Sequence, residues 1–305
     1  MDHHGRSATS ATQEDEISVP DNESGGKLSA FGASVDEFGL LMRLADVSDL
    51  APIVLAIHPN VYRPDDQLRV DLAVLPGLIA AGLVDAEGVI DPDVEAWLHT
   101  LQAPDAELAV RIFDGDQALR GAIVRKDDQV VVVFRHDDLL TVQGYRTDGE
   151  DFDSTVVEPV WRALGASDPA DFDSLTLEAN ELGEIVATFD PSSKDPRSER
   201  EFRGRLREHD LSSEAMDILV EAARYSGRRA EIVYHRVDLN GVRAQAKWAV
   251  GVMDTSRGRV LSTTTRSRRG DNDVTLSPGT RRRFAEGLNE LVARGGCVSW
   301  FDVAH

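Results

Sequence analysis

The clearest pattern in the chain is a stretch whose apolar residues have the spacing of a helix, followed by stretches whose apolar residues have the pattern of strands. In the stretch 91–104, apolar residues recur at i, i+3, i+4 and i+7, which is one face of a helix. Asp91 is a typical N-cap, and Pro92 suits the first helical position. The stretch therefore predicts a helix that buries Val94, Trp97, Leu98 and Leu101.

Four strands with short acidic turns are predicted next. They cover 107–113, 118–126, 129–136 and 139–145, and Asp114–Gln117, Asp127-Asp128 and Asp137-Asp138 join them. The unbroken apolar run Val130–Phe134 predicts a central strand that is buried on both faces. A helix at about Ser154–Leu164 follows.

The second half of the chain repeats this order of elements. A helix over 210–227, capped by Asp210 and ended by Gly227, precedes a strand over 230–238 and the hairpin signal Asn240-Gly241. The alternating stretch 243–254 predicts a strand with Trp248 on its core face, and strands at 258–266 and 273–277 and a helix over 278–292 complete the order. The repeat predicts two pseudo-equivalent subdomains, 29–170 and 171–305.

The remaining segments are less regular. Residues 1–28 are acidic and rich in Ser, Thr and Gly, so we expect a disordered tail. Structure is predicted to begin near Ser34 with a helix capped by Ser34 or Asp36. A short buried strand is expected at 51–59, and a helix at 68–88 that Pro76 bends or breaks.

The stretch 251–261, GVMDTSRGRVL, has two chemical interpretations. A loop of Gly and Arg can cradle a phosphate, but such a loop needs a helix N-terminus or a backbone nest behind it. Here the loop joins two predicted strands, and a hairpin turn needs only Gly258 and small polar residues. The pattern favours the turn.

Charge is distributed unevenly along the chain, which has a net charge of -21. Residues 1–190 carry 12 basic and 38 acidic side chains, whereas residues 191–305 carry 21 and 16. A strongly acidic protein repels nucleic acid, so we expect no nucleic-acid partner.

Three features of the sequence bear on where the protein is found. No apolar run is long enough to cross a bilayer, the N-terminus lacks an apolar signal segment, and Cys297 is the single cysteine. These features predict a cytoplasmic protein without membrane insertion.

Catalytic motifs are missing from the sequence. It has no GxSxG, HExxH, GxGxxG after a strand, or GxxxxGK[ST], and DFDS at 151–154 and 171–174 lacks EF-hand spacing. We therefore expect a binding protein with no catalytic residue, metal or cofactor. The alternative is a hydrolase or transferase whose dispersed site lies between the halves, around His235 and Asp238.

Four stretches occur in a characteristic order: VDEFGLLMRL, AAGLVDAEGVIDPDVEAWL, FDGDQALRGAIVRKDDQVVVVFRHDDLLTV and AVGVMDTSRGRVLS…DVTLSPGTRRRFAEGLNELV. Together with the order of predicted elements, they resemble the EspG family, the cytosolic chaperones of the ESX, or type VII, secretion systems of mycobacteria and their relatives. The likeness runs from about Ser34 to Trp300. Its most specific part is the Asp254–Arg259 hairpin followed by Ser277-Pro278-Gly279.

The resemblance implies an α+β fold of two pseudo-symmetric halves that share a central antiparallel sheet, flanked by helical bundles. It also implies a chaperone that binds the PPE subunit of a PE–PPE heterodimer near its tip, keeps it soluble and marks it for one secretion system. The expected contact residues lie in the turn between the second and third strands and before the helix at Asp210. They are Phe113, Asp114, Gly115, Asp116, Gln117, Arg203, Arg205 and Arg207.

Two further alternatives stay open at this point. A structural subunit of the secretion machine would associate with membrane components rather than with secreted substrates. Self-association of the chain is also compatible with the sequence.

Overall fold

The structure is a computed structural model that describes residues 29–47, 52–58, 61, 63–146, 152–192, 195–224, 227–237, 243–266, 272–296 and 300–301. The predicted tail 1–28, the Asn240-Gly241 turn, Asp238 and Cys297 lie outside the described residues.

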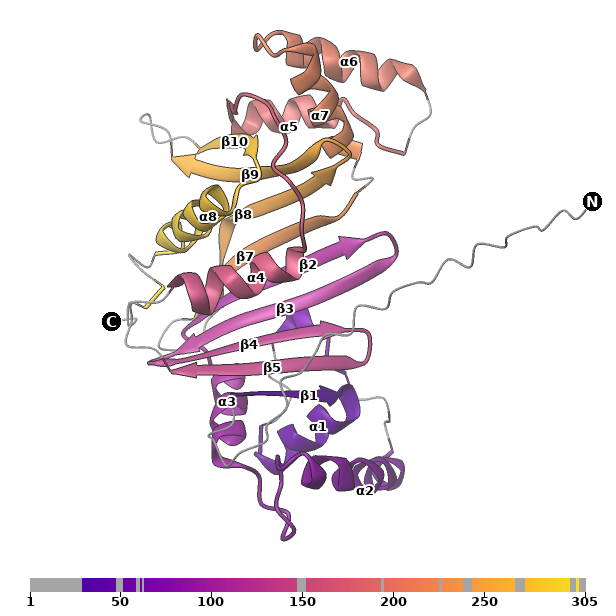
Figure 1. Cartoon of the computed structure of the whole chain (residues 1–305), viewed down its shortest axis with the longest axis vertical. Helices are drawn as coiled ribbons and strands as arrows, with labels where there is room; N and C mark the ends of the chain where they lie inside the picture. Colours follow the sequence, from indigo (N-terminus) through magenta and orange to yellow (C-terminus); the bar gives the residue numbers. More distant parts are fainter. Residues whose placement is uncertain are drawn as a thin grey trace, which may run out of the picture.

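A single antiparallel sheet of ten strands runs through the molecule (Figure 1). Its strand order is β1-β5-β4-β3-β2-β7-β8-β9-β10-β6. The strands are β1 (Ala30–Ser34), β2 (Ala106–Asp114), β3 (Gln117–Lys126), β4 (Gln129–His136), β5 (Leu139–Arg146), β6 (Leu175–Glu178), β7 (Arg229–Val237), β8 (Arg243–Thr255), β9 (Gly258–Arg266) and β10 (Asn272–Pro278).

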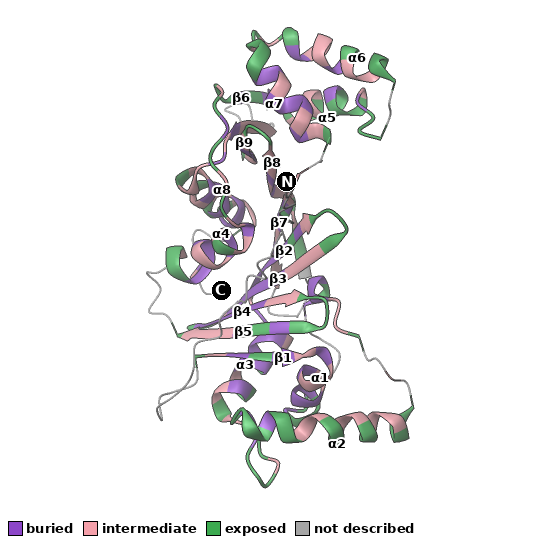
Figure 2. Cartoon of the chain, turned by 45° about the vertical axis from the view of Figure 1, so that its right-hand side comes forward, coloured by how far each residue is buried: buried purple, intermediate pink, exposed green. Residues whose placement is uncertain are grey.

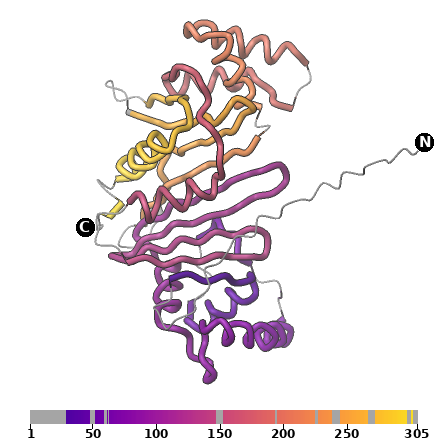
Figure 3. Tube along the Cα trace, in the orientation of Figure 1, coloured from indigo at the N-terminus to yellow at the C-terminus, as the bar shows by residue number. Residues whose placement is uncertain are grey.

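The two halves of the chain have the same topology. Each half starts with a short edge strand, continues with helices and then forms a four-stranded meander, whose last strand pairs with that edge strand. The first meander strands, β2 and β7, pair with each other from Ala106↔Arg236 to Phe113↔Arg229 and so join the halves. Figure 3 shows the halves following one another along the long axis. The predicted α+β fold with two pseudo-symmetric halves is confirmed.

The predicted boundary between 29–170 and 171–305 falls between α4 and β6. It stays a prediction, because all ten strands belong to one continuous sheet.

The helices cover the two faces of the sheet differently. They are α1 (Val35–Leu44), η1 (Ile53–Leu55), α2 (Pro64–Ala80), α3 (Pro92–Gln102), η2 (Asp153–Val157), α4 (Glu158–Leu164), α5 (Ala179–Ala187), α6 (Pro196–Arg207), α7 (Ser213–Arg224) and α8 (Arg281–Arg294). Helices α4 and α8 lie together on one face, which we call the covered face (Figure 2). On the other face, α1–α3 pack at one end and α5–α7 at the other, and we call it the open face.

The central strand β4 shows how the sheet is buried on both sides. Val130 and Val132 pack on the covered face, whereas Val131 and Val133 pack on the open face. This confirms the interpretation of the unbroken apolar run, because alternate side chains of a strand point to opposite faces.

The expected strand at 51–59 is wrong, because residues Ile53–Leu55 form the 3-10 turn η1. Ala56 has a left-handed backbone with φ +49, which interrupts an extended conformation. The carbonyl groups of this turn accept hydrogen bonds from two arginine side chains instead of a neighbouring strand. Arg120 Nη1 donates to Val54 O over 3.5 Å, and Arg135 Nη1 donates to Leu55 O over 2.9 Å.

Two other expectations need correction. Helix α2 starts at Pro64 and runs through Pro76 to Ala80. Pro76 has no N–H to donate to the carbonyl of Leu72, four residues earlier, and Leu72 lies on the exposed side of the helix. Asp210 has φ +54 and is not the cap of α7. Instead, Ser212 Oγ accepts the Ala215 N–H over 3.1 Å, and α7 ends at Arg224.

Strand β1 is the first element after the tail and was not expected from the sequence. It pairs with β5, and Phe31 is buried against the core.

We predict that a chain beginning at Ser29 keeps the melting temperature of the full chain in thermal unfolding, because the tail's composition cannot support a packed core.

A chain that begins at Val35 is the control for this prediction. It loses β1 and the buried Phe31, so its melting temperature is expected to fall. A drop already in the chain that begins at Ser29 would show that the tail packs on the fold.

Candidate functional site

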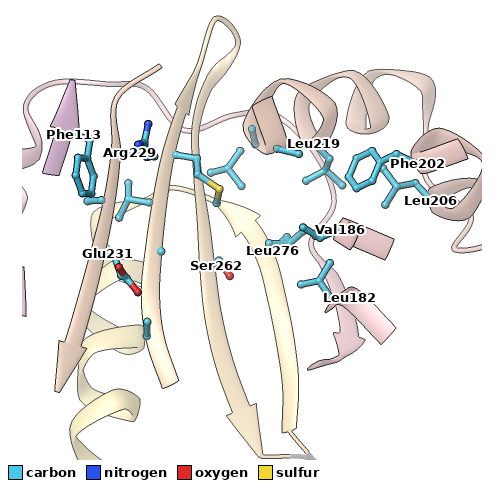
Figure 4. Close-up of a pocket in the computed structure, with 18 residues that line it drawn as sticks. Phe113, Leu182, Val186, Phe202, Leu206, Leu219, Arg229, Glu231, Ser262 and Leu276 are labelled. Carbon is cyan, nitrogen blue, oxygen red and sulfur yellow. The ribbon is translucent and has the colours of Figure 1, made fainter. Parts of the chain in front are cut away.

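An apolar hollow lies on the open face, between the sheet of the second half and helices α5–α7. Its volume is about 450 Å³, and we call it the groove (Figure 4). The described residues that line it are mostly apolar, and Arg229, Glu231 and Ser262 supply its polar side chains. The apolar lining is Phe113, Leu182, Val186, Phe202, Leu206, Leu219, Ala222, Ala223, Ala230, Ala249, Gly251, Val252, Met253, Val260 and Leu276.

Small residues form the floor of the groove. Ala249 and Gly251 lie on β8, and Gly251 pairs with Ser262 of β9. A Cβ atom added to Gly251 would lie 3.3 Å from Ser262 Cβ, which is a tight contact. Glycine therefore leaves only backbone at this point of the floor. A strand with small side chains allows another molecule to approach the sheet closely.

The far wall is made by the helices that follow β6. Val186 of α5 is 40% exposed, whereas Phe202 and Leu206 of α6 are buried, one turn apart on the inner face of that helix. Helix α6 begins where Asp195 Oδ1 accepts the Arg197 N–H over 2.9 Å. The wall thus combines buried anchors with an apolar rim.

The three candidate arginines 203, 205 and 207 precede α7, as expected, and they lie on the preceding helix α6. They are outside the groove lining. Arg203 bonds Glu199 at 2.8 Å and Asp217 of α7 at 2.7 Å. Arg205 lies 3.8 Å from Glu184 and 3.7 Å from Glu208, and Arg207 is exposed.

These ion pairs fix α6 against α7. Hydrogen bonds from Arg203, and then from Arg224, lower the pKa of Glu199, and a hydrogen bond from Arg203 lowers the pKa of Asp217. Both carboxylates are therefore charged throughout the physiological pH range. The wall helix α6 is held by charge pairs on one side and by apolar packing on the other.

The near wall contains the predicted turn between β2 and β3. Phe113 lines the groove, and the Arg229 guanidinium lies 4.7 Å from the centre of its ring. Asp114 is bound by Arg228, with Nη2–Oδ2 at 2.7 Å and Nε–Oδ2 at 3.2 Å. Gly115 has φ +58, as a tight turn requires.

Asp116 and Gln117 complete this turn and are exposed. Phe113 thus lies in the same groove as the inner face of α6, although the two are far apart in the sequence (Figure 4). Ala249 and Gly251 could not be recognised from the sequence as groove residues, because small apolar residues in a strand carry no chemical signature.

The hairpin at 254–259 is a structural turn, as the sequence favoured. The Arg259 side chain is fully buried and bonds Asp254 at 2.7 and 2.9 Å. Arg259 also donates to the carbonyls of Leu164 and Gly165, each over 3.1 Å. Its guanidinium is committed to these groups and is not presented to a ligand.

The residues of the enzyme alternative lie elsewhere. His235 Nδ1 is 3.9 Å from Glu107 Oε1, and the two residues are register partners on β7 and β2. His235 is outside the groove lining, and Asp238 lies outside the described residues. In the part of the chain that the structure describes, no three His, Cys, Asp or Glu side chains gather closely enough to hold a metal ion. Within the same part, no helix has the length and apolar character that a membrane crossing needs.

Comparison with known proteins shows where this fold occurs. The EspG family model matches residues 34–290. The chain is 27% identical to ESX-1 secretion-associated protein EspG1 of Mycobacterium marinum, over 90% of this chain and 92% of that protein. It is 28% identical to ESX-3 secretion-associated protein EspG3 of Mycolicibacterium smegmatis, over 85% of each.

A solved structure has the same fold. It is that of the Mycobacterium tuberculosis type VII secretion system chaperone EspG5 in complex with a PE25-PPE41 dimer, with a TM-score of 0.67. The match covers 87% of this chain and 96% of that chain at 18% sequence identity. Because the family model spans most of the chain, this protein belongs to the EspG family.

Proposed function

We propose that this protein is a cytoplasmic secretion chaperone. In this role it binds the PPE subunit of a PE–PPE heterodimer, keeps the heterodimer soluble and directs it to an ESX type VII secretion system. Membership of the EspG family supports the proposal, as does the PE25-PPE41 dimer bound to EspG5. The observation that carries it is the apolar groove on the open face, in which Arg229, Glu231 and Ser262 are the few polar side chains.

The chemistry of the groove suits binding rather than catalysis. Leu182, Val186 and Met253 offer apolar surface, and exposed apolar surface on a partner would otherwise promote aggregation. The small floor residues Ala249 and Gly251 let a helical tip reach the sheet itself. Covering the tip of the PPE subunit in this way keeps the heterodimer soluble.

The candidate contact residues take different parts in this proposal. Phe113 contributes apolar surface inside the groove, and Asp116 and Gln117 are exposed in the turn that follows it. Asp114 and Gly115 fix the shape of the turn, through the Arg228 ion pair and the positive φ angle.

The arginines of α6 lie on the outer side of the far wall. Arg203 positions α6 through Glu199 and Asp217. Arg205 and Arg207 are basic groups at the edge of the proposed contact with the heterodimer. Charges at such an edge act mainly on the selectivity and the rate of association between the two partners.

The decisive experiment is co-purification with a PE–PPE pair from the same genome. We predict a stable complex that contains one copy of each chain, measured by light scattering after gel filtration. Val186→Asp is expected to weaken binding by roughly tenfold or more, because it places a carboxylate against apolar surface.

Leu68→Asp is the matched control for that substitution. Leu68 is 59% exposed on α2, at the opposite end of the molecule, and its replacement is expected to leave binding unchanged. Equal binding by both variants would exclude the groove as the contact. Absence of any complex with PE–PPE pairs would contradict the proposed function.

A further inference from the structure

The open face continues beyond the groove into the first half of the molecule. One row of register partners crosses six neighbouring strands and joins the two halves. The row runs Arg135, Arg120, Arg111, Glu231, Gly251 and Ser262, from β4 to β9. Its last three members, Glu231, Gly251 and Ser262, line the groove.

The turn η1 stands over the other end of this row. The side chains of Arg120 and Arg135 donate to its Val54 and Leu55 carbonyls. Val54 and Leu55 are buried against the sheet, whereas Ile53 is 79% exposed. An aliphatic side chain held at the surface by a turn that is itself anchored suits contact with another molecule.

From these observations we propose that η1 is a second docking wall, so that the bound helical tip lies in a trough between Ile53 and helices α5–α7. The inference rests on the proposed function and extends its contact surface to the first half of the chain. The trough floor is the exposed middle of the row, Arg111 and Glu231, together with Gly251.

The width of the trough identifies the shape of its occupant. Strands lie about 4.8 Å apart, so the four spacings from β3 to β9 span roughly 19 Å. A single helix is about 10–12 Å across, whereas two packed helices with axes about 8–10 Å apart measure roughly 20 Å. The occupant that fits both walls is therefore the loop end of a two-helix hairpin.

The charges on the floor suit the same occupant. The loop end of a helical hairpin presents the carbonyl groups that end one helix and the N–H groups that begin the next. Arg111 can donate to the carbonyls, and Glu231 can accept from the N–H groups, each with the favourable sign of the helix dipole. The cross-strand order of the two charges places the end of the first helix beside η1 and the start of the second beside the groove.

The first test is Ile53→Ser in the full chain, titrated with a purified PE–PPE heterodimer. We expect roughly tenfold weaker binding, because an aliphatic contact is lost. Leu139→Ser is the matched control. Leu139 is 67% exposed and neighbours the open-face residue Leu140, so it points to the covered face and its replacement is expected to leave binding unchanged.

The second test reverses the floor charges. Arg111→Glu and Glu231→Arg are each expected to weaken binding, and the double variant is expected to stay weak, because the helix dipoles of the partner keep their direction. Restoration of binding in the double variant would show that the two charges act only on each other. That result would overturn the charge assignment.

Three outcomes separate this inference from the proposed function. If Ile53→Ser binds as the parent does while Val186→Asp fails, η1 is no docking wall and the groove proposal stands. If neither substitution affects binding, the groove proposal fails as well. If the chain alone forms a dimer by light scattering and Ile53→Ser dissociates it, the occupant is a second copy and the inference is overturned.

Discussion

Replacing Arg259 with alanine is expected to lower the free energy of unfolding by about 3–5 kcal/mol, measured by urea denaturation. The Arg259 side chain has no exposed surface and forms a bidentate pair with Asp254. Alanine would leave the Asp254 carboxylate without its counter-charge in a poorly hydrated place. Loss of one partner of a buried ion pair is among the most destabilising single changes.

The position of Arg259 adds to the effect. Its Nη2 atom bonds the carbonyls of Leu164 and Gly165, where α4 ends, and its guanidinium lies 5.0 Å from the Trp161 ring centre. The Arg259 backbone N–H also donates to the backbone carbonyl of Asp168 over 2.7 Å. This one residue of the second half therefore holds the chain segment that leaves the first half.

Arg257→Ala is the control in the same hairpin. Arg257 is 47% exposed and lies 3.4 Å from Asp217, so its removal is expected to cost about 1 kcal/mol or less. Arg259→Lys should not restore stability, because one ammonium group cannot replace a bidentate fork. A stability of Arg259→Ala close to that of Arg257→Ala would contradict the assigned role.

The second large effect is expected for Trp97→Ala, at about 3–5 kcal/mol of unfolding free energy. Trp97 is 3% exposed and stacks on Phe31, with ring centres 6.0 Å apart. A Cβ atom on Gly144 of β5 would lie 2.0 Å from the Trp97 ring, so the tryptophan fills the space that this glycine leaves. Alanine at position 97 would open a large cavity between α3 and the sheet.

Trp248 is the matched comparison, and the expectation that it lies in the core needs correction. Trp248 is half-buried at the edge of the core cluster under α8, and the Arg294 guanidinium lies 5.6 Å from its ring centre. Trp248→Ala is therefore expected to cost only about 1–2 kcal/mol. The same urea series measures both variants, and an equal loss for the two would refute this difference in packing.

Local signals in the sequence located several elements correctly. Asp91 caps α3 and Pro92 opens it, because an N-cap and a first-turn proline act within a few residues. The meander β2–β5 followed from apolar runs separated by short acidic turns. These patterns were sufficient because each depends on neighbours along the chain.

Other elements carried no comparable signal. Strands β1 and β6 are short edge strands whose partners, β5 and β10, are distant in the sequence. Helix α6 offers only Phe202 and Leu206 as apolar anchors among its charged residues, so its sequence resembled a polar connection. Residues Ile53–Leu55 have the composition of a strand, but two arginine side chains and a left-handed Ala56 hold them as a turn.

The candidate site shows the same division. The turn at Phe113–Gln117 was expected through the family resemblance, and the arginines near position 205 were expected because the second half of the chain is basic. The structure places Phe113 and the inner face of α6 in one groove and adds the small floor residues Ala249 and Gly251. An alanine or glycine in a strand becomes informative only when its neighbours across the sheet are known.

The spacing of apolar residues and the turn residues predicted the repeated order of helices and strands, and hence the two similar halves. The pairing of β2 with β7, and the meeting of Phe113 with helices α5–α7 in one groove, became apparent only in the folded chain. The physical reason is that the apolar period of a strand specifies which side chains are buried. It does not specify which distant strand accepts its backbone hydrogen bonds, and that choice is made by the packing of the whole chain.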